Sequence, residues 1–161
     1  MKIFKLTALL ICAVFLFGCS KMEYSDDKSC RELGEGIEAL LDDSQEYSEF
    51  DGAHVDIYFD DSAEYDDLFA VYSTDNNDIN EFGVFHAPNA NVADDLLESC
   101  REYVEDMREG SRAFIASYAP GELPKLDGAE VRRFGNYVVY TVLSDSDAQS
   151  VFDYVKAVLE E

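Results

Sequence analysis

The sequence predicts an α+β domain in which a four-stranded antiparallel sheet packs against amphipathic helices. Two segments, 27–41 and 91–117, carry apolar residues at helical spacing. Two pairs of short apolar stretches are each joined by residues that favour tight turns, which is the pattern of hairpins. With a last helix, the elements follow in the order α-ββ-α-ββ-α. Helices that alternate with hairpins, rather than with single strands, favour the α+β class.

The first helix is expected over residues 27–41, with an apolar stripe of Cys30, Leu33, Ile37, Leu40 and Leu41. Gly34 and Gly36 either let this helix pack closely or weaken it, since each lowers helix propensity by ~1 kcal/mol relative to alanine. Residues 42–52 are polar and are expected to form a loop. Apolar and polar residues alternate over 55–59, which predicts a short edge strand or an ordered loop.

The first hairpin is expected from strands at 68–74 and 79–87. The residues between them, Asp75-Asn76-Asn77-Asp78, favour turns because their side chains cap their own backbone. The longest helix then begins at Asn89 or Asn91 and extends to about Ser117. Its apolar stripe is the clearest periodic pattern in the chain and consists of Val92, Leu96, Leu97, Cys100, Tyr103, Val104, Met107, Ser111, Phe114, Ile115 and Tyr118. Gly110 interrupts this stripe, so we expect a kink or a break there.

The long helix ends at Pro120-Gly121, and residues 122–128 are expected to form a connecting loop. The second hairpin consists of strands at 130–134 and 137–144. They are joined by Gly135-Asn136, a two-residue turn that accepts positive φ. The last helix extends to about Leu159, and Ser146 with Gln149 three residues later forms a capping-box pattern at its start.

The first nineteen residues have the pattern of an export signal. Lys2 and Lys5 precede an apolar run at 6–17. This run is shorter than the ~20 residues that a membrane-spanning helix needs. The exit, Leu16-Phe17-Gly18-Cys19, resembles the lipobox of bacterial lipoproteins. The resemblance implies cleavage after Gly18 and a diacylglyceryl group, with fatty acids such as palmitate, on Cys19; the alternative is a plain signal anchor.

We therefore expect three parts: a signal peptide at 1–18, a polar tether at 19–28 and a single α+β domain at 29–161. Two acyl chains are sufficient for stable anchoring. The domain would then be held on the extracytoplasmic side of the cell membrane, at the cell surface, with the membrane as its partner through the lipid at Cys19.

The charge of the chain excludes one class of partner. The formal net charge is −23, and removal of the signal, which carries two lysines and no acid, makes it −25. Binding of nucleic acid requires Lys and Arg at the phosphates, so we expect no nucleic-acid partner. An anionic lipid surface likewise attracts basic segments, so the domain itself is expected to stand off the lipid. An acidic, well-solvated surface explains the charge without any function.

Two cysteines remain for the exported domain, Cys30 and Cys100. Each lies in the tetrapeptide Ser-Cys-Arg-Glu and on the apolar stripe of an expected helix. An exported chain permits a disulfide between them. Free cysteine also behaves as a small buried hydrophobe, so two buried thiols are the equal alternative.

The sequence contains no constellation that indicates catalysis, so we expect a non-catalytic protein with no cofactor and no metal site. His54 and His86 lie on strand-like segments without a flanking motif and are expected at the surface or at a rim. Acidic stretches at 56–67 and 75–78 lack the ligand spacing of an EF-hand loop. Pairs of acids suited to glycoside hydrolysis carry no information, because thirty-five carboxylates always include close pairs.

From Phe82 onward the chain resembles a domain-of-unknown-function family of small lipoproteins from Gram-positive gut anaerobes. The resemblance is carried by Tyr118-Ala119-Pro120 with Glu122, Lys125 and Leu126, by Gly135-Asn136-Tyr137-Val138-Val139-Tyr140 and by Ser144-Asp145. It extends more loosely over residues 30–160. It implies an anchored extracytoplasmic protein with no established activity, and it supplies no catalytic residues.

Two functions are consistent with these observations. The first is a membrane-anchored extracytoplasmic interaction or accessory module that binds a protein partner and does not catalyse. The alternative is a lipoprotein that binds a small ligand or a cation, for which the acidic loops near Asp60 and Asp75 are the support.

Overall fold

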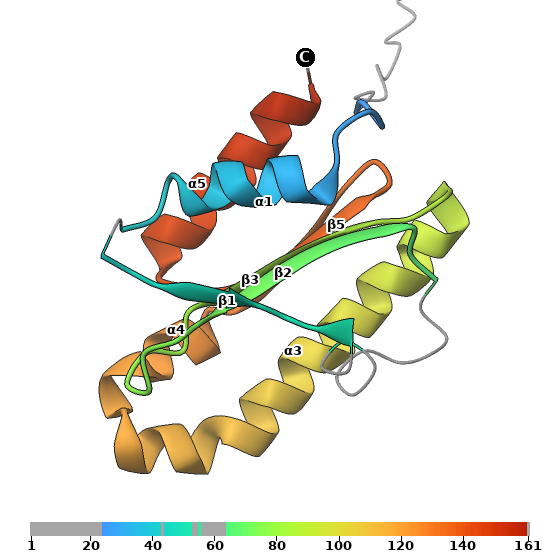
Figure 1. Cartoon of the computed structure of the whole chain (residues 1–161). Helices are drawn as coiled ribbons and strands as arrows, with labels where there is room; N and C mark the ends of the chain where they lie inside the picture. Colours follow the sequence, from blue (N-terminus) through green and yellow to red (C-terminus); the bar gives the residue numbers. More distant parts are fainter. Residues whose placement is uncertain (1–23, 43, 53–54, 56–63, 161) are drawn as a thin grey trace, which may run out of the picture.

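A computed structural model describes residues 24–42, 44–52, 55 and 64–160, which form a five-stranded antiparallel sheet with helices on both faces (Figure 1). The strands stand in the order β1-β2-β3-β5-β4. In chain order the described elements are α1 (Cys30–Glu38), β1 (Tyr47–Glu49), β2 (Asp67–Ser73), β3 (Glu81–His86), α3 (Ala90–Tyr118), the 3₁₀ turn η1 (Pro120–Glu122), α4 (Leu123–Asp127), β4 (Glu130–Phe134), β5 (Tyr137–Val142) and α5 (Asp145–Leu159).

Both expected hairpins are present. β2 pairs with β3 in a register that places Tyr72 opposite Glu81, and β4 pairs with β5 across the Gly135-Asn136 turn. Gly135 has φ +62°, the left-handed conformation that a two-residue turn of this kind requires and that glycine adopts without strain. β5 also pairs with β3, so the two hairpins join through their inner strands into one sheet.

Side chains alternate between the two faces of the sheet and form two separate cores. Phe82, Val84 and Val139 belong to the core under α1 and α5. Phe85 and Val138 belong to the core under α3. This division follows from the period of two along a strand. Figure 1 shows the same layering, with α1 and α5 on one side of the sheet and α3 on the other.

α1 lies unusually close to β2. A Cβ atom added at Gly34 would stand 2.0 Å from Cδ1 of Phe69, and one at Gly36 would stand 1.8 Å from the hydroxyl of Tyr154 on α5. Of the two alternatives for these glycines, close packing is therefore the one confirmed. Their cost in helix propensity is offset by the approach of the helix to the sheet.

Two elements differ from the expectation. Residues 42–52 were expected to form a loop but contain β1, a three-residue edge strand that pairs with β2. The prediction of four strands was therefore wrong, because β1 adds a fifth strand to the sheet. It has no apolar alternation, and its position is set by pairing and by a bidentate bond from Arg31 of α1 to Glu49, with both nitrogen–oxygen distances at 2.8 Å. Residues 122–128, also expected to be a loop, contain α4, which begins with Pro124 in its first turn, where proline is tolerated. The strand or ordered loop expected at 55–59 lies outside the described residues except for Val55. This residue is helical, not extended, and its N–H donates to the carbonyl of Asp51 at 3.1 Å.

The long helix has the expected boundaries, whereas the first and the last helix differ. α1 was expected over 27–41 but covers only Cys30–Glu38, because Ser29 caps its start and Ala39 ends it. Asn89 caps α3 by accepting from the backbone N–H groups of Asn91 and Val92. α3 continues through Gly110 without a break in its assignment, and Figure 1 shows its later part turning away from the line of its first part. The cap of α5 is Ser144, not Ser146, because Ser144 has the extended backbone of a cap and its hydroxyl accepts from the N–H of Asp147.

The chain enters the domain beside the end of α5. The backbone N–H of Ser25 donates to the carbonyl of Leu159 at 2.7 Å, and Asn136 donates to the carboxylate of Asp26 at 2.6 Å. Residues 24–28, which the sequence assigned to the tether, thus contact the domain. None of the helices in the described part combines the length and the apolar character that a membrane crossing requires.

Candidate functional site

A cavity of about 620 Å³ lies between the sheet and α3. This volume falls within the range of about 300–1,000 Å³ that small-molecule sites occupy. Its walls come from the end of β1, from β2 and β3 with the turn between them, and from the second half of α3. The lining residues are Phe50, Tyr72, Ser73, Asp78, Ile79, Asn80, Glu81, Tyr103, Asp106, Met107, Ser111, Phe114 and Ile115.

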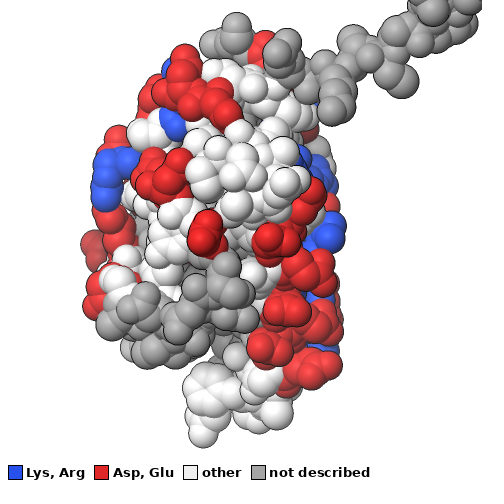
Figure 2. Space-filling model, turned by 90° about the vertical axis from the view of Figure 1, so that its right-hand side faces the viewer, with Lys and Arg blue, Asp and Glu red and all other residues white. Residues whose placement is uncertain are grey.

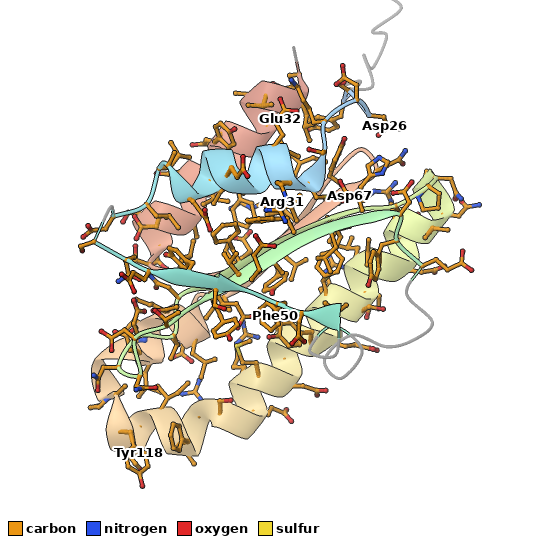
Figure 3. The ribbon with its side chains drawn as sticks, viewed as in Figure 1. Asp26, Arg31, Glu32, Phe50, Asp67 and Tyr118 are labelled. Carbon is orange, nitrogen blue, oxygen red and sulfur yellow. The ribbon has the colours of Figure 1, made fainter. Side chains whose placement is uncertain are left out.

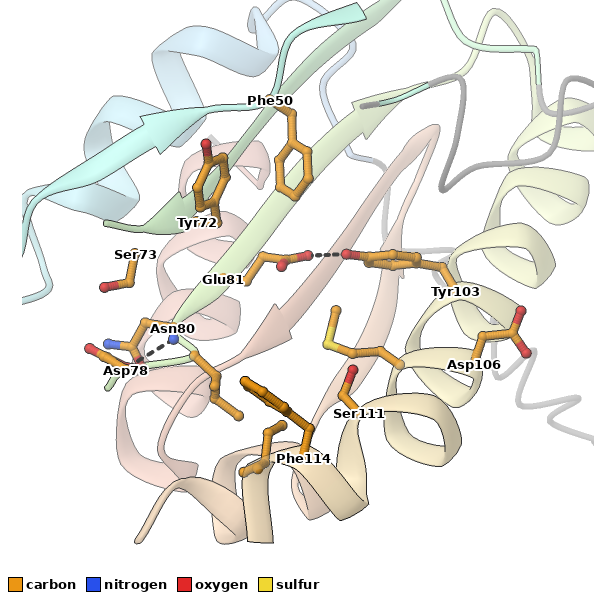
Figure 4. A pocket seen from close by; sticks show the side chains of 13 residues that line it. Phe50, Tyr72, Ser73, Asp78, Asn80, Glu81, Tyr103, Asp106, Ser111 and Phe114 are labelled. Carbon is orange, nitrogen blue, oxygen red and sulfur yellow. Dashed lines mark hydrogen bonds between the residues drawn. The ribbon is translucent and has the colours of Figure 1, made fainter. Parts of the chain in front are cut away.

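Glu81 is the charged group at the centre of this cavity (Figure 4). It is the first residue of β3 and projects from the face of the sheet that α3 covers. One carboxylate oxygen, Oε1, accepts from the hydroxyl of Tyr103 at 2.5 Å and from the hydroxyl of Tyr140 at 2.9 Å. The other oxygen, Oε2, has no hydrogen-bond partner among the described residues. The carboxylate is therefore held from one side and open on the other.

A glycine makes room for one of these tyrosines. Gly83 and Tyr140 are opposite each other on β3 and β5. A Cβ atom at Gly83 would stand 2.3 Å from Cε1 of the Tyr140 ring. The ring lies across the space that a side chain at Gly83 would fill, and from there its hydroxyl reaches Glu81.

Burial raises the pKa of Glu81 to about 7, while the hydrogen bonds from Tyr103 and Tyr140 act in the opposite direction. At neutral pH the carboxyl group is thus divided between its ionised and its neutral form. Burial, and then the nearby Glu81, raise the pKa of Tyr140 well above its usual value, so its hydroxyl keeps its proton and remains a donor.

Aromatic and aliphatic side chains form most of the remaining wall. The rings of Phe50 and Tyr72 lie on one side of Glu81 in Figure 4, with centroids 5.1 Å apart. Phe114 lies on the other side, is 64% exposed and packs against Tyr118, with ring centroids 4.6 Å apart. The cavity therefore offers apolar contact around the carboxylate of Glu81.

An ion-pair cluster fixes the turn at the edge of the cavity. Lys125 of α4 lies 2.8 Å from Asp78 and 2.6 Å from Glu122, and all three side chains are at least four-fifths buried. The cluster joins the turn between β2 and β3 to the segment that follows α3. Asp78, although it lines the cavity, is thereby neutralised by its own partner.

The structure separates the two cysteines. Cys30 belongs to the core under α1, whereas Cys100 belongs to the core under α3, on the opposite face of the sheet. Both are buried and free. Of the two alternatives from the sequence, this geometry corresponds to buried thiols. Burial raises the pKa of both thiols, so they are poor nucleophiles.

His86 lies far from the cavity, at the other end of β3. Its Nδ1 is 2.6 Å from Asp66 and its Nε2 is 3.4 Å from Asp26, and its ring packs against Tyr137. This agrees with a position at a rim. Cys19 and His54 lie outside the described residues.

The acidic turn at 75–78 is explained by local capping. Asp75 accepts from the backbone of Asn77, and Asp78 accepts from the backbone of Asn80, each at 2.9 Å. Most of the acidic stretch at 56–67 lies outside the described residues. Within the described part of the chain, no group of three or more His, Cys, Asp or Glu side chains is arranged to hold a metal ion.

Sequence reasoning did not select Glu81, although a signal was present. Glu81 shares a face of its strand with Gly83 and Phe85. The four residues that follow it on β3 are buried and carry no polar side chain. An acid in phase with an inward-facing position is unusual, because burial of an unpaired charge is costly. Partners for this acid come from residues 22 and 59 positions away, which no local pattern reveals.

The comparisons with known proteins identify a family but no activity. A domain of unknown function, DUF4358, matches residues 40–143, which include every residue that lines the cavity. The chain belongs to this family. No curated protein and no solved structure matches the chain.

Proposed function

We propose that this member of the DUF4358 family is a lipid-anchored protein of the extracytoplasmic side of the membrane, whose domain binds a small ligand without transforming it. The anchor is supported by the signal pattern and by Leu16-Phe17-Gly18-Cys19. The binding function is carried by one observation, the cavity that surrounds the half-free carboxylate of Glu81. An apolar pocket with a few convergent polar groups and a perturbed carboxyl pKa is typical of a ligand site.

The point where the chain enters the domain and the cavity lie at opposite ends of the molecule, which suits an anchor at one end and a binding site at the other. Asp26, near the point where the chain enters the domain, lies 3.4 Å from His86 at the end of β3. Glu81 stands at the start of the same strand, about 17 Å away at the usual rise per residue. Figure 3 shows Asp26 at one end of the molecule and Tyr118 at the other. A lipid on Cys19 would hold the first end near the membrane and leave the cavity open to the far side.

The lining of the cavity supports binding more than catalysis. Nucleophilic catalysis requires a nucleophile that is activated by an adjacent base. Among the described residues, Glu81 accepts two hydrogen bonds, both on Oε1, from the hydroxyls of Tyr103 and Tyr140. Within the described part of the chain, Ser73 and Ser111, the two serines of the lining, make no hydrogen bond to this carboxylate. We therefore propose a binding protein rather than an enzyme.

A protein partner is the second candidate, and a specific surface favours it. Phe114 and Tyr118 are exposed at 64% and 73%, and they stack on each other at the end of α3. They lie next to the cavity, at the end of the molecule opposite Asp26 (Figure 3). An accessory module would present such a pair to a partner, since aromatic side chains are enriched at interfaces.

The anchor is tested by detergent-phase partitioning of the full chain in a bacterial host. The wild-type protein is expected in the detergent phase, and Cys19→Ala in the aqueous phase. Cys12→Ala is the matched control, because it removes a cysteine from the signal without touching the acylated position, and it should partition as wild type. Retention of Cys19→Ala in the detergent phase would refute the anchor.

The cavity is tested with a fragment library and ligand-observed NMR. Ser111→Trp should fill the cavity and abolish the hits, because Ser111 lines it from α3. Ser117→Trp adds the same ring at an exposed position of the same helix and should leave the hits unchanged. A library without hits, or hits that are insensitive to Ser111→Trp, would exclude this cavity as the binding site.

A further inference from the structure

We infer that the cavity selects an organic cation, namely an apolar body that carries a single ammonium group. This inference rests on the proposed function, since it names the class of ligand that the same cavity takes. It follows from the charge of the lining, from the open oxygen of Glu81 and from the aromatic walls, which are three separate observations.

The charge of the lining favours a cation. Asp78, Glu81 and Asp106 line the cavity, and no Lys or Arg stands among the described lining residues. Asp78 is neutralised by Lys125, so the negative charge of the lining comes from Glu81 and Asp106. The basic side chain next to it, Lys125, is held between Asp78 and Glu122. Figure 2 shows acidic side chains gathered on the right and at the upper left of the face that it presents, with basic ones at its margins, in keeping with the net charge of −23. Glu81 and Asp106 would repel an anionic ligand, whereas they attract a cation.

Glu81 supplies the specific contact. Its Oε1 is fixed by Tyr103 and Tyr140, and its Oε2 has no hydrogen-bond partner among the residues that the structure describes. A hydrogen bond from an ammonium group to this oxygen would be charge-assisted, and such bonds are about twice as strong as neutral ones. The desolvation that raises the pKa of Glu81 also strengthens its attraction for a positive charge.

Asn80, in the same wall, carries a buried oxygen that could accept a hydrogen bond. Asn80 lines the cavity and is 9% exposed. Its Nδ2 donates to Gln45 at 3.2 Å, while its Oδ1 has no hydrogen-bond partner in the described part of the chain. Buried polar atoms are rarely left unsatisfied. Because this oxygen is itself buried, a donor on the ligand reaches it only if the Asn80 side chain turns toward the cavity.

The walls match an organic rather than an inorganic cation. The aromatic rings of Phe50, Tyr72, Tyr103 and Phe114 stand around the carboxylate, and the faces of such rings attract cations (Figure 4). Ca²⁺ requires six to eight oxygen ligands, whereas Glu81 offers one open oxygen, which suits an N–H donor. A volume of about 620 Å³ with these rings accommodates an apolar body.

The inference is tested with three probes of matched shape: 2-phenylethylammonium, 2-phenylethanol and phenylacetate. Dissociation constants are measured at pH 8 by NMR titration of the full-length protein in detergent micelles. We expect the ammonium probe to bind at least about tenfold more tightly than the alcohol, which corresponds to one charge-assisted hydrogen bond. Phenylacetate should bind most weakly.

Two variants assign the selectivity to its cause. Glu81→Gln keeps the size of the side chain and should weaken the ammonium probe about tenfold while it leaves the alcohol within about twofold. Tyr72→Leu removes an aromatic wall without touching the carboxylate and should weaken the ammonium probe more than the alcohol. Glu102→Gln removes one negative charge from the exposed face of α3 and is the control that should leave all three constants unchanged.

The outcomes distinguish this inference from the proposed function. If the alcohol or phenylacetate binds as tightly as the ammonium probe, the selectivity for a cation is wrong and the binding site stands. If library fragments bind in a way that Ser111→Trp abolishes but none of the three probes binds, the inference of an ammonium ligand is likewise wrong, while the proposed binding function is retained. If neither the library nor the probes bind, the proposed function fails with it.

Discussion

Replacement of Glu81 by glutamine should make the stability of the protein less dependent on pH. The pKa of Glu81 is raised from 4.5 to about 7 in the folded state. Below pH 4.5 the carboxyl is protonated in both the folded and the unfolded state. Between pH 4.5 and 7 the folded state binds more protons, so the free energy of unfolding falls as pH rises. Above pH 7 the loss is complete.

The magnitude follows from the difference in pKa. A difference of about 2.5 pH units, at ~1.36 kcal/mol for each unit, gives a loss of about 3 kcal/mol between pH 4.5 and 8. Glutamine carries no charge, and its Oε1 can still accept from Tyr103 and Tyr140. Glu81→Gln should therefore match wild type at pH 4.5 and exceed it by up to about 3 kcal/mol at pH 8.

Urea unfolding at pH 4.5, 6 and 8 measures this difference. Glu102→Gln is the control, because it removes the same charge from an exposed position of α3. Subtraction of the variant from wild type cancels the contributions of the other carboxylates. A ¹³C NMR titration of the Glu81 carboxyl supplies the pKa directly. A stability difference that stays constant from pH 4.5 to 8, together with a midpoint near 4.5, would refute the account of Glu81 as a desolvated acid.

Three further predictions follow from the packing. Gly83→Ala should destabilise the domain by about 1–3 kcal/mol in urea unfolding, because its Cβ would displace the ring of Tyr140; equal stability would mean that the ring has another place. Lys125→Ala should destabilise by about 1–3 kcal/mol, since it leaves two partly buried carboxylates unpaired. Lys156→Ala, which breaks the exposed pair with Glu160, is the control and should change stability by less than about 1 kcal/mol. Equal losses in the two lysine variants would mean that the Lys125 cluster stabilises the domain no more than an exposed ion pair does. The two buried cysteine thiols should react with a thiol reagent only after unfolding; one disulfide in the native protein would contradict their separation by the sheet.

Elements whose signal is local could be predicted from the sequence. The hairpin at Gly135-Asn136 needs only a residue that accepts positive φ between two apolar strands, and both are visible in the chain. The long helix is predicted by its stripe and by Asn89 at its start. The exposure of Phe114 and Tyr118 could not be predicted, because the stripe says which side of the helix is apolar and not how far the sheet extends beneath it.

The sequence by itself determined the α+β class, both hairpins, the long helix and the acidic character of the surface, because periodicity, turn chemistry and charge are properties of neighbouring residues. Only the tertiary structure decided that a three-residue segment becomes the edge strand β1, that helices cover both faces of the sheet, and that Tyr103 and Tyr140 meet at Glu81. An edge strand exists through its pairing partner, and a site assembled from β3, α3 and β5 exists only once these elements pack. The energy of such contacts depends on distances in space, which separation along the chain does not encode.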